Sequence, residues 1–233
     1  LEEKIRNRRV VAIMGGHGLA RTAAGYRTVA LIAKQLAEAG FLVATGGGPG
    51  AMEAAHFGAW MAYRSTADVE GALAILAESP EFADRESWLA SALAVKTAYP
   101  RQAGANGTVA DSLGIPTWHY GHEPPNVFAS HVAKYFANSL REDGLLAIAL
   151  AGVVFAPGSA GTIQEVFQDA AQNHYESSGV VSPMVFFGVD YWTNVKPVYP
   201  LLATLAEGHA YGSLLAIHDS VDEIVSTVMQ HAS

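Results

Sequence analysis

A single carboxylate, that of Glu165, follows a glycine-rich turn in the stretch VVFAPGSAGTIQEVFQDAAQ. The hydrophobic part of this stretch ends at Phe155, residues 157–161 form the turn, and the following residues are predicted to form a helix with Glu165 in its first turn. A carboxylate in this place has two chemical uses. It can take a proton or stabilise positive charge in a reaction, or it can cap the helix, because Thr162 and Glu165 fit the capping-box pattern T-x-x-E. The residues alone leave both uses open.

Two further glycine turns follow hydrophobic runs nearer the N-terminus, GGHG after VVAIM and GGGPG after FLVAT. Backbone N–H groups in such turns and at helix N-termini bind anions, so each turn is a candidate phosphate site. Tight turning and close packing are the alternative explanation for each glycine. We predict that a phosphorylated ligand is held by residues from all three turns, namely Gly15, Gly16, Gly46, Gly47, Gly48, Gly158, Ser159, Gly161 and Thr162.

The first turn does not fit the dinucleotide-binding pattern G-x-G-x-x-G. Counting from Gly16 and Gly18, the third glycine of the pattern is replaced by Arg21. The second hydrophobic run ends at Thr45, whereas an NAD site has Asp or Glu there to bind the ribose. An enzyme that depends on NAD or NADP is therefore disfavoured, and we expect no cofactor.

Charge and composition exclude several classes of protein. The chain of 233 residues carries 14 basic and 22 acidic side chains, a formal charge of −8, which argues against binding long nucleic acids through many phosphate contacts. No apolar run reaches the roughly 18 residues of a membrane span. These two observations lead us to expect neither nucleic-acid nor membrane partners. The absence of cysteine fits a reducing compartment, so we expect a cytoplasmic protein. The chain begins at Leu1, which leaves open whether a segment precedes it.

The order of the predicted elements is that of an α/β protein. The unit of strand, glycine turn and helix occurs twice within residues 10–64, which is typical of a parallel sheet with crossover helices. We predict one domain over 1–233, in which residues 65–114 form a helical insertion. The predicted strands are 10–14, 41–45, 115–120, 152–156, 184–188 and 214–218, and the predicted helices include 22–39, 51–64, 68–77, 86–98, 127–141 and 196–207.

The predicted helix over 127–141 has two contrasting sides. One is rich in aromatic and aliphatic residues beyond what one face of a sheet needs, which contributes to our expectation of a homodimer or larger closed oligomer. The other carries a polar stripe of His131, Lys134, Asn138 and Arg141. Such a stripe is either a solvated helix face or the source of a functional side chain.

Two of the glycine turns, with the helices that follow them, resemble a known family. GGGPGAMEAAHFGA and PGSAGTIQE are similar to the paired signatures of the LONELY GUY family of nucleoside 5′-monophosphate phosphoribohydrolases, many of which carry an older lysine decarboxylase label. The resemblance covers residues 10–64 and roughly 115–230. The family's second signature reads PGGxGTxxE, so Ser159 replaces one glycine and places a Cβ where the family has none.

The resemblance implies a Rossmann-like, doubly wound fold and hydrolysis of an AMP-like nucleotide to a free base and ribose 5-phosphate. It implies that Glu165 and an arginine are catalytic, and that members are typically dimeric. The family's arginine is followed by lysine, whereas Arg141 is followed by Glu142. Arg141 is nevertheless the only arginine after Arg101 and is the candidate. We expect AMP or an N6-modified AMP as substrate.

Two other functions compete with this interpretation. A non-catalytic carrier of a nucleotide or of molybdenum cofactor remains open, because related folds carry such ligands. Lysine decarboxylation would need pyridoxal phosphate on a lysine, and none of the five lysines lies in a cofactor motif.

Two further groups of residues have ordinary explanations. His119, His122 and Glu123 match no zinc spacing, so we predict no metal site. Glu53 is predicted to be an acidic residue in the first turn of a helix, without a special role.

Overall fold

The computed structural model describes residues 1–118, 126–177 and 179–231. In these residues seven strands, all parallel, form one sheet in the order β4-β3-β2-β1-β5-β6-β7. Their bounds are β1 Val10–Met14, β2 Leu42–Thr45, β3 Ser112–Gly114, β4 His131–Val132, β5 Val153–Phe155, β6 Met184–Phe187 and β7 Leu215–His218.

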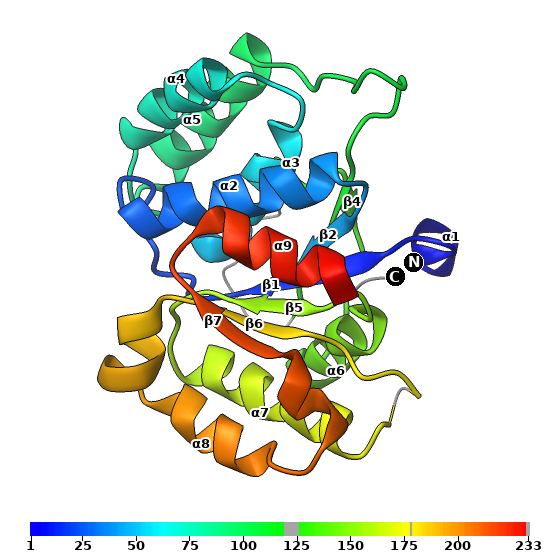
Figure 1. The fold of residues 1–233 in the computed structure, drawn as a ribbon. Coiled ribbons are helices and arrows are strands. Elements are labelled where there is room, and N and C mark those ends of the chain that lie inside the picture. The colour runs from blue at the N-terminus through cyan, green and yellow to red at the C-terminus, as the bar shows by residue number, and fades with distance from the viewer. Residues whose placement is uncertain (119–125, 178, 232–233) are drawn as a thin grey trace.

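Helices cover both faces of this sheet, so the predicted doubly wound α/β fold is confirmed (Figure 1). One face carries α2 (Ala24–Glu38), α3 (Ala51–Trp60) and α9 (Val221–His231), with α4 (Thr66–Ala77) and α5 (Arg85–Ala98) outside them. The other carries α6 (Asn138–Ile148), α7 (Ala160–His174) and α8 (Val198–Leu205). The remaining short segments are α1 (Glu2–Ile5), the π-helix η1 (Tyr191–Val195) and the 3₁₀-helix η2 (Ala210–Leu214).

The strand order reverses between β1 and β5. From β1 the chain proceeds to β2 on one side, and after β4 it returns to pair β5 with the other side of β1. Ligands of open parallel sheets bind at such a switch point, beyond the carboxyl ends of the strands. The turns after β1 and β5 both lie there, which places two of the three glycine turns side by side.

The central strands are continuous hydrophobic runs because both of their faces are covered. In β1, Val11 and Ile13 belong to the core under α2 and α3, whereas Ala12 and Met14 belong to the core over α6 and α7. This alternation is the two-residue period of a strand. All five residues of β1 are at most 3% exposed, so helix packing on both sides fixes the strand firmly.

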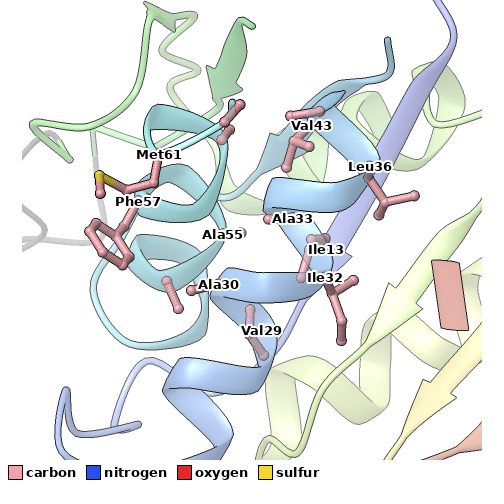
Figure 2. Close-up of a cluster of buried hydrophobic side chains, with 14 of the residues drawn as sticks. Ile13, Val29, Ala30, Ile32, Ala33, Leu36, Val43, Ala55, Phe57 and Met61 are labelled. Atoms are coloured by element: carbon pink, nitrogen blue, oxygen red, sulfur yellow. The ribbon is translucent and has the colours of Figure 1, made fainter. Parts of the chain in front are cut away.

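Small residues bring α2 and α3 into close contact. A Cβ on Gly58 would lie 2.0 Å from the carbonyl oxygen of Ala30, so this crossing requires glycine. Figure 2 shows Ala30 and Ala33 of α2 together with Ala55 of α3 in the same buried cluster. The two helices follow the first two glycine turns, and their contact therefore fixes the distance between those turns.

The predicted helix over 127–141 is wrong. Residues 131–132 form β4, which pairs with β3 at the edge of the sheet, and α6 begins only at Asn138. The backbone N–H of Ala133 donates to Gly114 and that of Tyr135 to Pro116, so sheet pairing takes the groups a helix would use. A tertiary contact thus overrides a helical spacing of apolar residues.

The loss of this helix removes one reason for expecting a dimer. Val132, Phe136 and Leu140 are exposed, but they lie on β4, on the segment after it and on α6 rather than on one helix face. The homodimer stays a prediction that derives from the family resemblance.

Residues 65–114 contain the expected helices, α4 and α5, and end in an unexpected strand. β3 occupies residues 112–114 and pairs with β2, immediately before the predicted strand over 115–120. Residues 119–120 of that predicted strand lie outside the described residues. No helix in the described parts of the chain is long and apolar enough to cross a membrane.

Candidate functional site

The three glycine turns contact one another. The N–H of Gly16 donates to the carbonyl of Pro157 (3.1 Å), and the carbonyl of Gly16 accepts from the N–H of Ala51 (3.0 Å). A Cβ on Gly15 would lie 2.7 Å from the Cβ of Ala51, and one on Gly50 would lie 2.4 Å from the Gly16 carbonyl oxygen. Close packing therefore explains Gly15 and Gly16 of the first turn, whereas a Cβ on Gly18 would meet no atom within 4 Å.

The predicted phosphate-binding glycines divide into two groups. Gly158 lies against Thr162, and Gly47, with a positive φ of 77°, lies against Pro116, so both are packed rather than open. A Cβ on Gly161, in contrast, would meet no atom within 4 Å. In the third turn, Gly161 is therefore the glycine whose backbone faces free space.

A cavity of about 240 Å³ lies where the turns meet. It is lined by eight of the predicted site residues: Gly15, Gly16, Gly46, Arg141, Ser159, Gly161, Thr162 and Glu165. The residues that we had not singled out are Met14, His17, Met52, Glu142 and Ala160. Gly47, Gly48 and Gly158 do not line it; Gly47 and Gly158 are packed as described above, and the N–H of Gly48 donates to Sδ of Met52 at 3.4 Å.

The N-terminus of α7 forms one wall of this cavity. Ser159 is the N-cap residue, its side chain makes no capping bond, and the first helical bond runs from the N–H of Ile163 to the Ser159 carbonyl. The N–H groups of Ala160, Gly161 and Thr162 precede this first donor and therefore have no acceptor within the helix. Together with the positive end of the helix dipole they favour an anion.

Glu165 does not cap the helix. It is the sixth residue of α7 rather than a first-turn residue, because the helix begins at Ala160, two residues before Thr162. The capping-box interpretation and the first-turn placement are therefore wrong. The Glu165 side chain points back to α6, where Nη1 of Arg141 donates to its Oε1 at 3.1 Å.

Arg141 is held on the cavity wall by α6 and α7. Its Nη2 donates to Oδ1 of Asn138 (2.7 Å), and its side chain is only 12% exposed. The interpretation as a solvated stripe is therefore wrong for Arg141. Asn138 stays beside Arg141, whereas His131 lies 3.6 Å from Asp111 and the Lys134 ammonium lies over a tryptophan ring.

Glu142 holds this arrangement together, although we did not predict it as a site residue. Its Oε1 accepts from Asn138 Nδ2 and its Oε2 accepts from Gln164 Nε2, both at 2.6 Å. Glu142 is 2% exposed, and it links α6 to α7 with its Oε1 3.5 Å from Nη2 of Arg141. One sequence signal could have identified Glu142: it stands directly after Arg141, where the family has lysine.

Burial raises the pKa of Glu165 to about 7. The Arg141 guanidinium opposes this rise, and the nearby Glu142 carboxylate adds to it. A carboxyl group whose pKa lies near neutrality is suited to accept a proton from water at neutral pH. The cavity thus combines a helix N-terminus that favours an anion with a carboxyl group whose pKa lies near neutrality.

A second buried ion pair, Arg21 with Glu53, lies outside this cavity. Glu53 is in the first turn of α3 as expected, but both side chains are only 1% exposed, and two hydrogen bonds join them. The Arg21 guanidinium also donates to the carbonyls of Ser79 and Trp88 and to Oγ of Ser91. The residue that replaces the third glycine therefore anchors the α4–α5 insertion.

No group of three or more His, Asp or Glu side chains among the described residues is arranged to hold a metal ion. His119, His122 and Glu123, which we considered as ligands, lie outside those residues.

No family model matches the chain, and no curated protein matches it in sequence. Solved structures share its fold over nearly the whole length. The molybdenum cofactor binding protein from Rippkaea orientalis has a TM-score of 0.60 at 14% identity, covering 97% of this chain and 99% of its own. The molybdenum cofactor carrier protein from Chlamydomonas reinhardtii has a TM-score of 0.56 at 16% identity, covering 96% and 98%. Structural genomics target TM1055 has a TM-score of 0.55 at 19% identity, covering 95% and 99%.

Proposed function

We propose that the protein is a nucleoside 5′-monophosphate N-glycosidase that releases a free base and ribose 5-phosphate from AMP or an N6-modified AMP. The observation that carries the proposal is the pairing of Arg141 with Glu165 at 3.1 Å on the wall of a cavity whose other wall is the α7 N-terminus. The resemblance of the two signatures to the LONELY GUY family supports it.

The N-terminus of α7 binds the 5′-phosphate in this proposal. The N–H groups of Ala160, Gly161 and Thr162 donate hydrogen bonds to the phosphate oxygens. The free space at Gly161 leaves room for these oxygens. The Cβ of Ser159 does not block this approach, because the residue lies at the exposed N-cap, before the first helical N–H. Holding the phosphate fixes the ribose beside Glu165.

Glu165 then assists cleavage of the N-glycosidic bond. As the bond from C1′ to the base breaks, the electron pair leaves with the base and positive charge develops on the ribose. The carboxylate stabilises that charge and takes a proton from the water whose oxygen bonds to C1′. That proton ends on the departing base, which leaves as the neutral free base while Glu165 returns to the carboxylate form. Arg141 orients Glu165 and neutralises the phosphate or assists the departing base.

We expect AMP to be hydrolysed and its 5′-phosphate to be required. The test is to incubate the protein with a panel of nucleoside monophosphates and assay ribose 5-phosphate, with adenosine as the matched ligand lacking the phosphate. Calorimetric titration should show adenosine binding far more weakly than AMP, because the helix N-terminus addresses phosphate. Equal affinities would contradict the phosphate site, and turnover of no nucleotide would contradict the catalytic role.

We expect turnover to fall on the acid side of neutrality. The Glu165 pKa of about 7 means that the carboxylate form is lost below that pH, so kcat/KM should drop about tenfold for each pH unit further down. Arg141→Gln removes the charge that lowers this pKa, so it should shift the midpoint to higher pH. A profile of the parent protein that is flat between pH 5.5 and 8 would contradict the role of Glu165 as base.

A second candidate function is non-catalytic binding of a phosphorylated cofactor. It is favoured by the two structural neighbours that are described as a molybdenum cofactor binding protein and a molybdenum cofactor carrier protein. The α7 N-terminus, which favours an anion, suits the phosphate of a phosphorylated cofactor as well as that of a nucleotide. Binding without release of ribose 5-phosphate in the same assay would favour this candidate.

A further inference from the structure

A second cavity, of about 270 Å³, lies between the turn after β1 and the loop that joins α4 to α5. Its walls come from residues 17–21, from Pro49 and Gly50, and from the insertion residues 80–83 with Trp88. His17 lines this cavity and also the one that contains Arg141 and Glu165. The two cavities are therefore neighbours that share one residue at their boundary.

The insertion provides an aromatic wall for the second cavity. The Phe82 ring is half-buried and meets the ring of Trp88 edge to face, with 5.2 Å between ring centroids. Trp88 is 2% exposed, and the Arg21 guanidinium lies 4.6 Å from its ring centroid. Phe82 thus rests on side chains that are themselves fixed in the core.

The same loop is tied to the glycine turn by its backbone. The N–H of Arg21 donates to the carbonyl of Pro80 at 3.0 Å, and the Arg21 side chain donates to the carbonyl of Ser79, three residues before Phe82. Phe82 is therefore held in a fixed position relative to the first turn. A preformed, mostly apolar cavity with a few polar groups at its rim is the usual form of a small-molecule subsite.

We infer that this cavity binds the base of the nucleotide, with Phe82 as its stacking surface and the exposed carboxylate of Glu81 at the rim as acceptor for an amino N–H. The inference rests on the proposed function, because it places the phosphate at α7 and the ribose beside Glu165. His17 lines both cavities and so marks the direction in which the base extends from the ribose. An aromatic face binds any planar base, whereas a carboxylate acceptor selects a base with an exocyclic amine.

The insertion is therefore the element that determines which base is accepted. Its α4 and α5 pack outside α2 and α3 and contribute apolar side chains to the core on that face, but neither helix adds a strand to the sheet (Figure 1). The loop and Trp88 of α5 line the cavity beside the turn after β1, and no insertion residue lines the cavity at the α7 N-terminus. This division leaves the loop sequence free to set base preference without disturbing phosphate binding.

Comparing two ligands in Phe82→Ala tests the inference. Calorimetric titration should show AMP affinity falling about tenfold or more, because stacking on an aromatic side chain is lost. Ribose 5-phosphate affinity should change by less than about twofold, because that ligand has no base. Phe82→Tyr keeps the stacking surface and should retain parental AMP affinity. Leu89→Ala, an exposed position on α5 next to Trp88, is the control for disturbance of the insertion.

The outcomes separate this inference from the proposed activity. AMP bound by the parent but not hydrolysed would contradict the activity, while selective loss of AMP binding in Phe82→Ala would still support the base subsite. Unchanged AMP affinity in Phe82→Ala, or an equal loss for both ligands, would overturn the subsite whatever the turnover. A parent that binds neither ligand would overturn both.

Discussion

Glu165→Gln should release ribose 5-phosphate from AMP at least about a hundredfold more slowly than the parent, with little change in folding or AMP binding. Glutamine keeps the size of the side chain and an oxygen that accepts from Arg141 Nη1, so the contact between α6 and α7 survives. It lacks the negative charge that stabilises an oxocarbenium-like transition state and the basicity that takes a proton from water. The measurement belongs at pH 8, where the parent carboxyl group is mostly ionised.

Asp143→Asn is the matched control for this substitution. It removes the same charge from an exposed position on α6, away from the cavity, and should leave turnover near the parental rate. Thermal melting checks that both variants fold. Near-parental turnover in Glu165→Gln would contradict the catalytic role of Glu165 and leave the Arg141 pair as a structural link between helices.

Arg21→Met should lower the free energy of unfolding by about 3–5 kcal/mol. The substitution leaves the Glu53 carboxylate buried at 1% exposure without its partner, and it removes the bonds that hold the α4–α5 insertion. Burial already raises the pKa of Glu53 and Arg21 opposes the rise, so without Arg21 the pKa should rise further. Because the charged form is then the costly one, the loss of stability should be larger at pH 8 than at pH 5.

The free energy of unfolding of Arg21→Met, measured by chemical denaturation, should be compared with that of two further variants. Arg27→Met breaks an ion pair with Glu70 in which both side chains are 47% exposed, so it should cost about 1 kcal/mol or less. Arg21→Met combined with Glu53→Leu removes both buried charges and should recover most of the lost stability. A single Arg21→Met variant no less stable than Arg27→Met would show that the buried pair does not anchor the insertion.

The parts of the fold that sequence predicts are those whose signals are local. β1 and β2 are uninterrupted apolar runs, and the glycine turns after them mark where each helix begins. The two-residue strand β4 has no such signal, because it exists only through its pairing with β3. The helical spacing of apolar residues over 127–141 therefore led to the wrong element.

In the candidate site too, features with a local sequence signal were predictable, whereas contacts between distant residues were not. Glu165 and the turn before it were recognisable from one short stretch, whereas the pairing of Glu165 with Arg141 joins positions 24 residues apart. The pair Arg21 and Glu53, 32 residues apart, had no pattern that linked the two residues. The capping box failed for a local reason, because the helix already begins after Ser159 and Thr162 lies inside it.

The mutual hydrogen bonds of the three glycine turns have a thermodynamic consequence. Gly16 is bonded to the turn after β5 and to the start of α3, so none of the turns can move without breaking contacts in another. A ligand that enters this cavity finds its backbone donors already in place and loses little free energy to ordering the protein. The turns therefore act as a rigid template, and free and ligand-bound forms should superpose closely along residues 15–16, 50–51 and 157–158.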